Sequence, residues 1–170
     1  DSFIEVSVER TSALAKNWQK NLNVSGYHEL LGLGGVYADG QNTYVLIDSV
    51  LMTVSFPSVC AKSYHTLVKL DQSGERIWTK SFEALYSGCL GLKGLERAQG
   101  DKLYLLEPHR ILQLDTAGNL LNQRNLNGNN HTLVKSSGDE IMILRNNLAP
   151  GILMLDAQLD TVLWKTLSFN

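Results

Sequence analysis

The sequence predicts an all-β fold made of about three four-stranded units with one strand ahead of them. The main observation is a recurring pattern, an apolar strand that ends in Leu-Asp and is followed by a turn. It occurs at Leu70-Asp71, Leu114-Asp115 and Leu155-Asp156. The successive aspartates lie 44 and 41 residues apart, a spacing typical of the blades of a β-propeller. A second observation agrees, because no window shows a sustained apolar period of about 3.6 residues.

Each unit has room for four strands, because two further apolar or alternating segments precede every Leu-Asp strand. The segments directly before it follow Asp-Gly or Gly-Asp turn signals and span residues 44–50, 102–106 and 140–144. The segments before these turns supply the first strands and span residues 30–37, 90–98 and 132–135. The fourth strand of each unit follows the turn after Leu-Asp.

The strand ahead of the units lies at residues 18–22, where Trp18-Gln19-Lys20 has the same form as Trp78-Thr79-Lys80. It matches the fourth strand of a unit and is expected to stand alone ahead of the first unit. Residues 7–16 are the one candidate for a helix, but they show no sustained three-to-four spacing and stay unassigned. A closed propeller has about four to eight blades, so three units and a strand are too few. We expect residues 1–170 to form a single propeller-type domain or a fragment of a larger propeller.

An open array of three units exposes the apolar faces of its end sheets. We therefore expect a partner surface, provided either by another protein or by self-association. A β-sandwich is the alternative fold, since it would explain the strand content, but it would not explain the recurring Leu-Asp spacing.

The charge and hydropathy of the chain argue against two classes of partner. It has 15 basic and 17 acidic residues, a formal net charge of −2, and no basic run. Nucleic acid is not expected to bind, because phosphate recognition needs clustered Lys and Arg side chains. No apolar run approaches the roughly 20 residues that cross a bilayer, so no membrane span is expected.

The stretch Leu70-Asp71-Gln72-Ser73-Gly74-Glu75-Arg76-Ile77-Trp78 resembles the repeat of the quinoprotein-like (PQQ-like) β-propellers. The second unit has Asn122 at the Trp position, and the third has Leu159 at the Gly position and its Trp one residue late. In that family the Trp packs between neighbouring blades. The resemblance therefore implies blade packing by Trp18, Trp78 and Trp164.

The two cysteines fall on connections that are expected to emerge on one face. Cys60 lies between the second and third strands of the first unit, and Cys89 lies between that unit and the next. Consecutive strands alternate in direction, so a disulfide between Cys60 and Cys89 is geometrically feasible. Such a bond would indicate an oxidising compartment, periplasmic or extracellular. Two unrelated thiols in a cytosolic protein are the alternative.

The histidines are also expected to lie in connections on this loop-bearing face. They are His28, His65, His109 and His131. Their convergence suggests a binding face, because imidazoles bind metals when neutral and anions when charged. Ordinary loop histidines are the simpler interpretation, since no carboxylate pattern accompanies them, and no metal site is predicted.

No motif in the chain indicates a reaction, so no catalytic residue and no cofactor are predicted. The run Gly32-Leu33-Gly34-Gly35 lacks the Gly-Lys-Ser/Thr of a phosphate loop and is better explained as a strand with a close backbone approach. We expect a non-catalytic binding or scaffold module for protein–protein interaction. The alternative, which the resemblance implies, is a fragment of a quinone-dependent propeller dehydrogenase.

Overall fold

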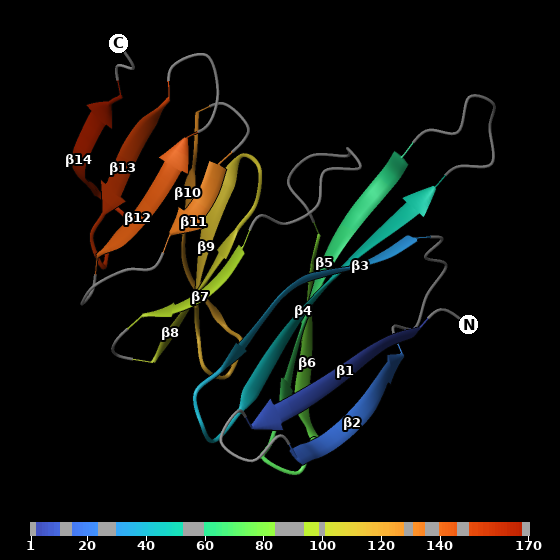
Figure 1. Ribbon diagram of the computed structural model, residues 1–170. Coiled ribbons are helices and arrows are strands. Elements are labelled where there is room, and N and C mark those ends of the chain that lie inside the picture. Colours follow the sequence, from blue (N-terminus) through green and yellow to red (C-terminus); the bar gives the residue numbers. More distant parts are fainter. Residues whose placement is uncertain are drawn as a thin grey trace. The chain divides into compact units, whose positions relative to one another are not determined.

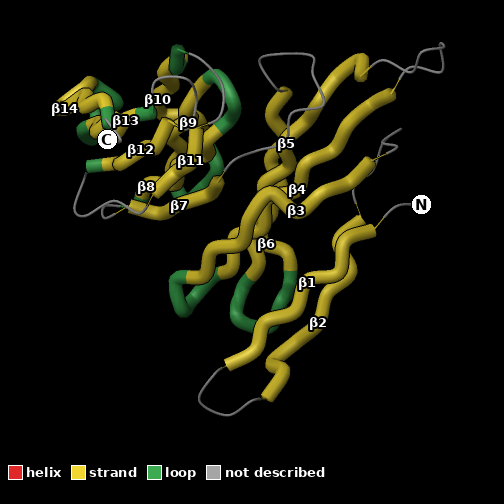
Figure 2. Tube along the Cα trace, turned by 45° about the horizontal axis from the view of Figure 1, so that its top comes forward, coloured by secondary structure: helices red, strands yellow, loops and turns green. Residues whose placement is uncertain are grey.

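The computed structural model describes nine segments of the chain. These segments are residues 3–10, 15–23, 30–52, 60–83, 94–98, 101–127, 131–134, 140–145 and 150–167. Figure 2 shows strands and loops in them and no helix, so no helix in these segments is long and apolar enough to cross a membrane. The chain divides into two compact units, residues 1–89 and 90–170.

The first unit contains a hairpin and a four-stranded antiparallel sheet (Figure 1). The hairpin pairs β1 (Phe3–Arg10) with β2 (Ala15–Asn23). The sheet runs in chain order through β3 (Leu30–Ala38), β4 (Thr43–Met52), β5 (Cys60–Leu70) and β6 (Arg76–Glu83). Within this unit, β1 lies beside β3.

The second unit contains two antiparallel four-stranded sheets, each again in chain order. One is formed by β7 (Gly94–Ala98), β8 (Lys102–Leu106), β9 (Arg110–Asp115) and β10 (Leu120–Asn125). The other is formed by β11 (His131–Val134), β12 (Ile141–Arg145), β13 (Gly151–Leu155) and β14 (Thr161–Thr166). Strand β11 lies beside β7 and β8, so the first strands of the two sheets are neighbours.

The predicted all-β class is confirmed, and three antiparallel sheets stand where the three units were expected. The expectation of a lone strand at residues 18–22 is wrong, because β2 pairs with β1 along its length. The missed signal is the alternation of Ile4, Val6 and Val8 with polar residues, which is the period of two of a strand. The expectation of a single domain stays a prediction.

An aspartate caps the turn before the last strand of each four-stranded sheet. Asp71 Oδ1 accepts hydrogen bonds from the backbone N–H groups of Ser73 at 2.8 Å and Glu75 at 2.9 Å. Asp115 and Asp156 bind the N–H groups two and four residues further on in the same way. Three residues after each aspartate the backbone is left-handed, at Gly74 (φ 81°), Gly118 (φ 79°) and Leu159 (φ 66°). The recurring Leu-Asp pattern therefore marks one repeated turn.

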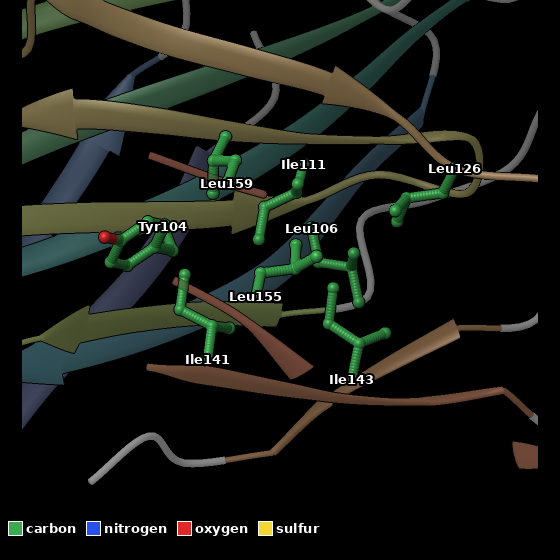
Figure 3. Packing of buried hydrophobic residues seen from close by; sticks show 8 residues of the cluster. All are labelled: Tyr104, Leu106, Ile111, Leu126, Ile141, Ile143, Leu155 and Leu159. Atoms are coloured by element: carbon green, nitrogen blue, oxygen red, sulfur yellow. The ribbon is translucent and has the colours of Figure 1, made fainter. Parts of the chain in front are cut away.

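The core of the second unit lies between its two sheets. Tyr104 and Leu106 come from β8 and Ile111 from β9, while Ile141 and Ile143 come from β12. Figure 3 shows these side chains gathered with the three other members of the cluster, Leu126, Leu155 and Leu159. Side chains alternate along a strand, so this core fixes which face of each sheet is turned inward.

The hydrogen bonds to Asp71 predict a titration behaviour. The Ser73 hydroxyl, which donates to Asp71 Oδ1 at 2.6 Å, and the backbone N–H groups lower the pKa of Asp71 below its ordinary value. The turn is therefore most stable above the ordinary aspartate pKa, and this contribution is lost as the pH falls through the lower pKa of the folded state. We expect Ser73→Ala to raise the pKa of Asp71, measured by NMR titration of its carboxyl carbon. An unchanged pKa in this variant would contradict the assignment.

Glycine usually stabilises a left-handed backbone position, but at Leu159 in the third turn we expect the substitution by glycine to destabilise the protein. Glycine would relieve the positive φ of Leu159, by roughly 1–2 kcal/mol. However, the Leu159 side chain is only 2% exposed in the core, and removing a buried leucine costs roughly 2–5 kcal/mol. We expect Leu159→Gly to lower the free energy of unfolding by roughly 1–3 kcal/mol in urea denaturation. A variant more stable than the wild type would mean that the backbone effect dominates.

Candidate functional site

The histidines that the structure describes are not all loop residues. His65 lies inside β5 with 1% of its surface exposed, because this strand begins at Cys60 and is longer than expected. The expectation that His65 lies in a connection is therefore wrong. His109 does lie in the turn between β8 and β9 and is half-buried. His28 lies outside the described residues, and His131 is the first residue of β11.

The buried His65 has a structural partner in the neighbouring strand. Its Nδ1 lies 2.9 Å from Oδ1 of Asp48, the residue opposite it in β4. Asp48 is largely buried too, so the pair places two polar side chains in the interior, where their mutual hydrogen bond offsets the cost of leaving water. This arrangement explains His65 as a structural residue of the first sheet.

The disulfide between Cys60 and Cys89 stays a prediction. Cys60 is the first residue of β5, and Cys89 lies outside the described residues. The glycine run, by contrast, fits the strand interpretation, because residues 32–35 lie within β3 and the strand has a register shift there. A Cβ added to Gly34 would lie 3.2 Å from Leu46 Cγ, so the backbone approach is close.

The three tryptophans do not share one strand position. The register places Trp18 opposite Val8 and Trp78 opposite Lys69, each next to a register shift. In the third sheet this position belongs to Leu163, opposite Met154, and Trp164 follows it. Neighbouring residues of a strand point to opposite faces, so Trp164 lies on the face opposite to Leu163. Trp164 is therefore not the structural counterpart of Trp78.

Trp78 packs against other aromatic side chains of the first sheet. Its ring centroid lies 6.2 Å from that of Tyr44, which is fully buried, and Tyr37 continues the row with its centroid 6.3 Å from that of Tyr44. The ammonium of Lys69 lies 5.4 Å from the Tyr44 ring centroid. The side chain of Trp18 is not described, so its expected packing stays a prediction.

Trp164 instead lies against a glycine and an arginine. A Cβ added to Gly151 would lie 2.9 Å from Cη2 of Trp164, so the indole ring covers this glycine. The guanidinium carbon of Arg145 lies 5.7 Å from the centroid of the indole ring, which is a cation–π distance. Trp164 remains 42% exposed. The ring is thus held at the margin of the sheet with part of its surface open.

A cavity of about 340 Å³ lies beside this tryptophan in the second unit. Its lining combines two arginines with amide, hydroxyl, apolar and aromatic side chains. The lining residues are Arg124, Asn125, Leu126, Asn127, Arg145, Leu153, Thr161 and Trp164. They come from both sheets of the unit, and no carboxylate is among these described residues.

Hydrogen bonds to the turn of the third sheet hold Arg124 in place. Its guanidinium donates to the backbone oxygen of Leu159 and, at 2.6 Å, to Oγ1 of Thr161. Nearby, Gln113 Nε2 donates to the backbone oxygen of Ala157 at 2.9 Å. The two sheets are therefore joined by polar contacts at this turn as well as by the apolar core.

The sequence did not single out Arg124 or Arg145. An arginine near the end of a strand is usually a solvated charge, and neither residue belongs to a motif. Only the pairing of the strands brings them to one cavity. Within the described segments, no three His, Cys, Asp or Glu side chains gather to hold a metal ion.

No family model matches the sequence, and no curated protein matches it. A solved structure of a protein of unknown function from Bacteroides caccae is similar over 95% of this chain and 68% of that chain, with 9% sequence identity and a TM-score of 0.49. The resemblance to the quinoprotein-like propellers therefore stays a prediction.

The different surroundings of the two rings predict unequal contributions to stability. We expect Trp78→Ala to lower the free energy of unfolding by roughly 2–4 kcal/mol, because it removes a half-buried ring from an aromatic row. Trp164→Ala is expected to cost only about 1–2 kcal/mol, because its ring is 42% exposed. Urea denaturation of both variants measures the difference. A larger loss for Trp164→Ala would contradict this assignment.

Proposed function

We propose that this chain is a non-catalytic β-propeller-type binding or scaffold module that associates with protein through the last strands of its sheets. The observation that supports this is the position of the exposed apolar side chains. Among the residues whose side-chain exposure the structure describes, which leave out β1, β2, β7 and β11, the large exposed apolar side chains other than Val36 all lie on β6, β10 or β14. They are Ile77, Leu120, Leu121, Val162, Leu163 and Trp164, each between 42% and 53% exposed.

Strand β14 is the clearest case, because all six of its residues are exposed. It is the edge strand of its sheet, so one row of its backbone N–H and C=O groups is not used within that sheet. An edge strand with exposed apolar side chains is suited to pairing with another strand. We therefore expect β14 to pair with a strand of a protein partner or of a second copy of this chain.

The propeller arrangement is part of the proposal. It is supported by three consecutive four-stranded sheets in chain order, each with the same aspartate-capped turn before its last strand. It is also supported by the second unit, where the first strand of one sheet lies beside the first strand of the other. The periplasmic or extracellular location rests on the proposed disulfide alone.

Sedimentation velocity over a wide dilution range tests the association. We expect the wild type to form a concentration-dependent dimer or larger species, which Leu163→Lys weakens at least about tenfold by placing a charge on the apolar strand. Gln41→Lys is the matched control, because it adds the same charge at an exposed position in the turn between β3 and β4, outside the last strands of the sheets. A wild type that remains monomeric throughout, or equal effects of both variants, would contradict the proposal.

The alternative, a fragment of a quinone-dependent dehydrogenase, predicts that the same protein binds a quinone and calcium. A bound quinone and calcium would raise the melting temperature by mass action. We expect no saturable shift with the quinone and calcium together. A saturable shift that a calcium chelator abolishes would favour the dehydrogenase over the scaffold.

A further inference from the structure

We propose that the cavity beside Trp164 binds the carboxylate of a small planar organic acid. This goes beyond the proposed association of β14. Trp164 is one of the exposed apolar side chains of β14, but it lines the cavity, on the face of the strand opposite to Leu163, whose substitution tests the association. Loss of association in Leu163→Lys and loss of ligand binding in Arg145→Gln can therefore occur independently.

The first argument is the charge of the cavity. Arg124 and Arg145 both line it, and neither pairs with a carboxylate among the described residues. Nε of Arg145 is buried and has no hydrogen-bond partner in this part of the chain. A buried cationic group is costly unless it is paired, so the guanidinium of Arg145, which lines the cavity, is suited to an anionic acceptor supplied by a ligand.

In the neighbouring sheet, β7–β10, the position that corresponds to Arg145 carries a charge that is balanced by an ion pair. Strand pairing makes Glu107 the counterpart of Arg145 and Arg110 the counterpart of Gly151. Glu107 accepts hydrogen bonds from Arg110 Nε at 2.6 Å and from Arg110 Nη2 at 2.8 Å, so the two charges form an ion pair. In the third sheet both partners are replaced, and a single positive charge remains beside the Trp164 ring.

The second argument is the shape and rigidity of the site. Arg124 is fixed by its bonds to Leu159 and Thr161, so its guanidinium is already ordered before a ligand binds. The Trp164 ring lies against Gly151, which limits its movement toward the sheet. Groups that are ordered in advance lose less entropy on binding, which favours affinity.

The third argument identifies the ligand. An arginine guanidinium matches the two oxygens of a carboxylate in a planar fork. Trp164, Leu126 and Leu153 add apolar and aromatic surface for a flat body, and Asn125 and Asn127 also line the cavity. A volume of about 340 Å³ lies at the small end of ligand pockets, so the ligand is a small molecule.

Isothermal titration calorimetry of the full chain with 2-naphthoate tests the proposal. We expect saturable binding at a single site in the wild type. Arg145→Gln should weaken it about tenfold or more, because it removes a charge-assisted hydrogen bond. Arg76→Gln is the matched control and should bind as the wild type does, because Arg76 is an exposed arginine in the first unit.

Two further arms separate the carboxylate from the other contributions. The neutral alcohol 2-naphthylmethanol should bind at least about tenfold more weakly than 2-naphthoate, and inorganic phosphate should bind more weakly as well. Gly151→Ala keeps both arginines, but its Cβ would lie 2.8 Å from the backbone oxygen of Lys165 and 2.9 Å from the Trp164 ring, so it displaces the ring and its strand and should weaken 2-naphthoate binding several-fold. Unchanged melting temperatures would show that these variants fold.

The proposal is overturned if the wild type shows no saturable binding of 2-naphthoate up to about 10 mM, or if Arg145→Gln binds it as the wild type does. It is also overturned if 2-naphthylmethanol binds equally well, because the site would then be only apolar. Phosphate binding as tight as that of 2-naphthoate would identify a simple oxyanion site and would likewise reject the planar acid.

Discussion

The aspartate-capped turn before the last strand of each sheet is the constraint on which the rest of the structure depends. One carboxylate oxygen accepts two backbone N–H groups in every copy, at Asp71, Asp115 and Asp156. This fixes the left-handed residue three positions later and, with the register shift beyond it, the side chains that the last strand turns to each face. A slip of one residue here would exchange the two faces of that strand.

In the second unit this turn also joins two sheets. Its backbone oxygens at Ala157 and Leu159 accept hydrogen bonds from Gln113 and Arg124 of the preceding sheet. The side chain of Leu159 enters the apolar core from the same turn. One short segment therefore supplies both polar and apolar contacts, which explains why a leucine is retained at a backbone position that would suit glycine better.

The local rules of the sequence predicted most of the strands but not the site. The Leu-Asp spacing and the Gly-Asp signals identified the sheets because turn chemistry is local. The segment 7–16 does not predict β1, because the alternation of this strand begins at Ile4. His65 was misplaced because a strand can extend well past its apolar segment, and sequence alone does not show where pairing ends. The cavity depends on contacts between residues far apart in the chain, Arg124, Arg145 and Trp164, which no spacing rule identifies.

The cavity arises where the third sheet departs from the repeat. The counterparts of Trp164 in the other sheets are Thr79 and Gln123, and the counterpart of the Arg145 position in the second sheet is an acid. Where the second sheet has Arg110, the third sheet has Gly151, which leaves space for an indole ring. Where the second sheet has Glu107, the third sheet has Arg145, which places a positive charge beside that ring. Neither change improves the core, since Trp164 is 42% exposed and the charge lacks a carboxylate among the described residues. Departures that leave the packing unimproved but together create a charged aromatic pocket are best explained by binding.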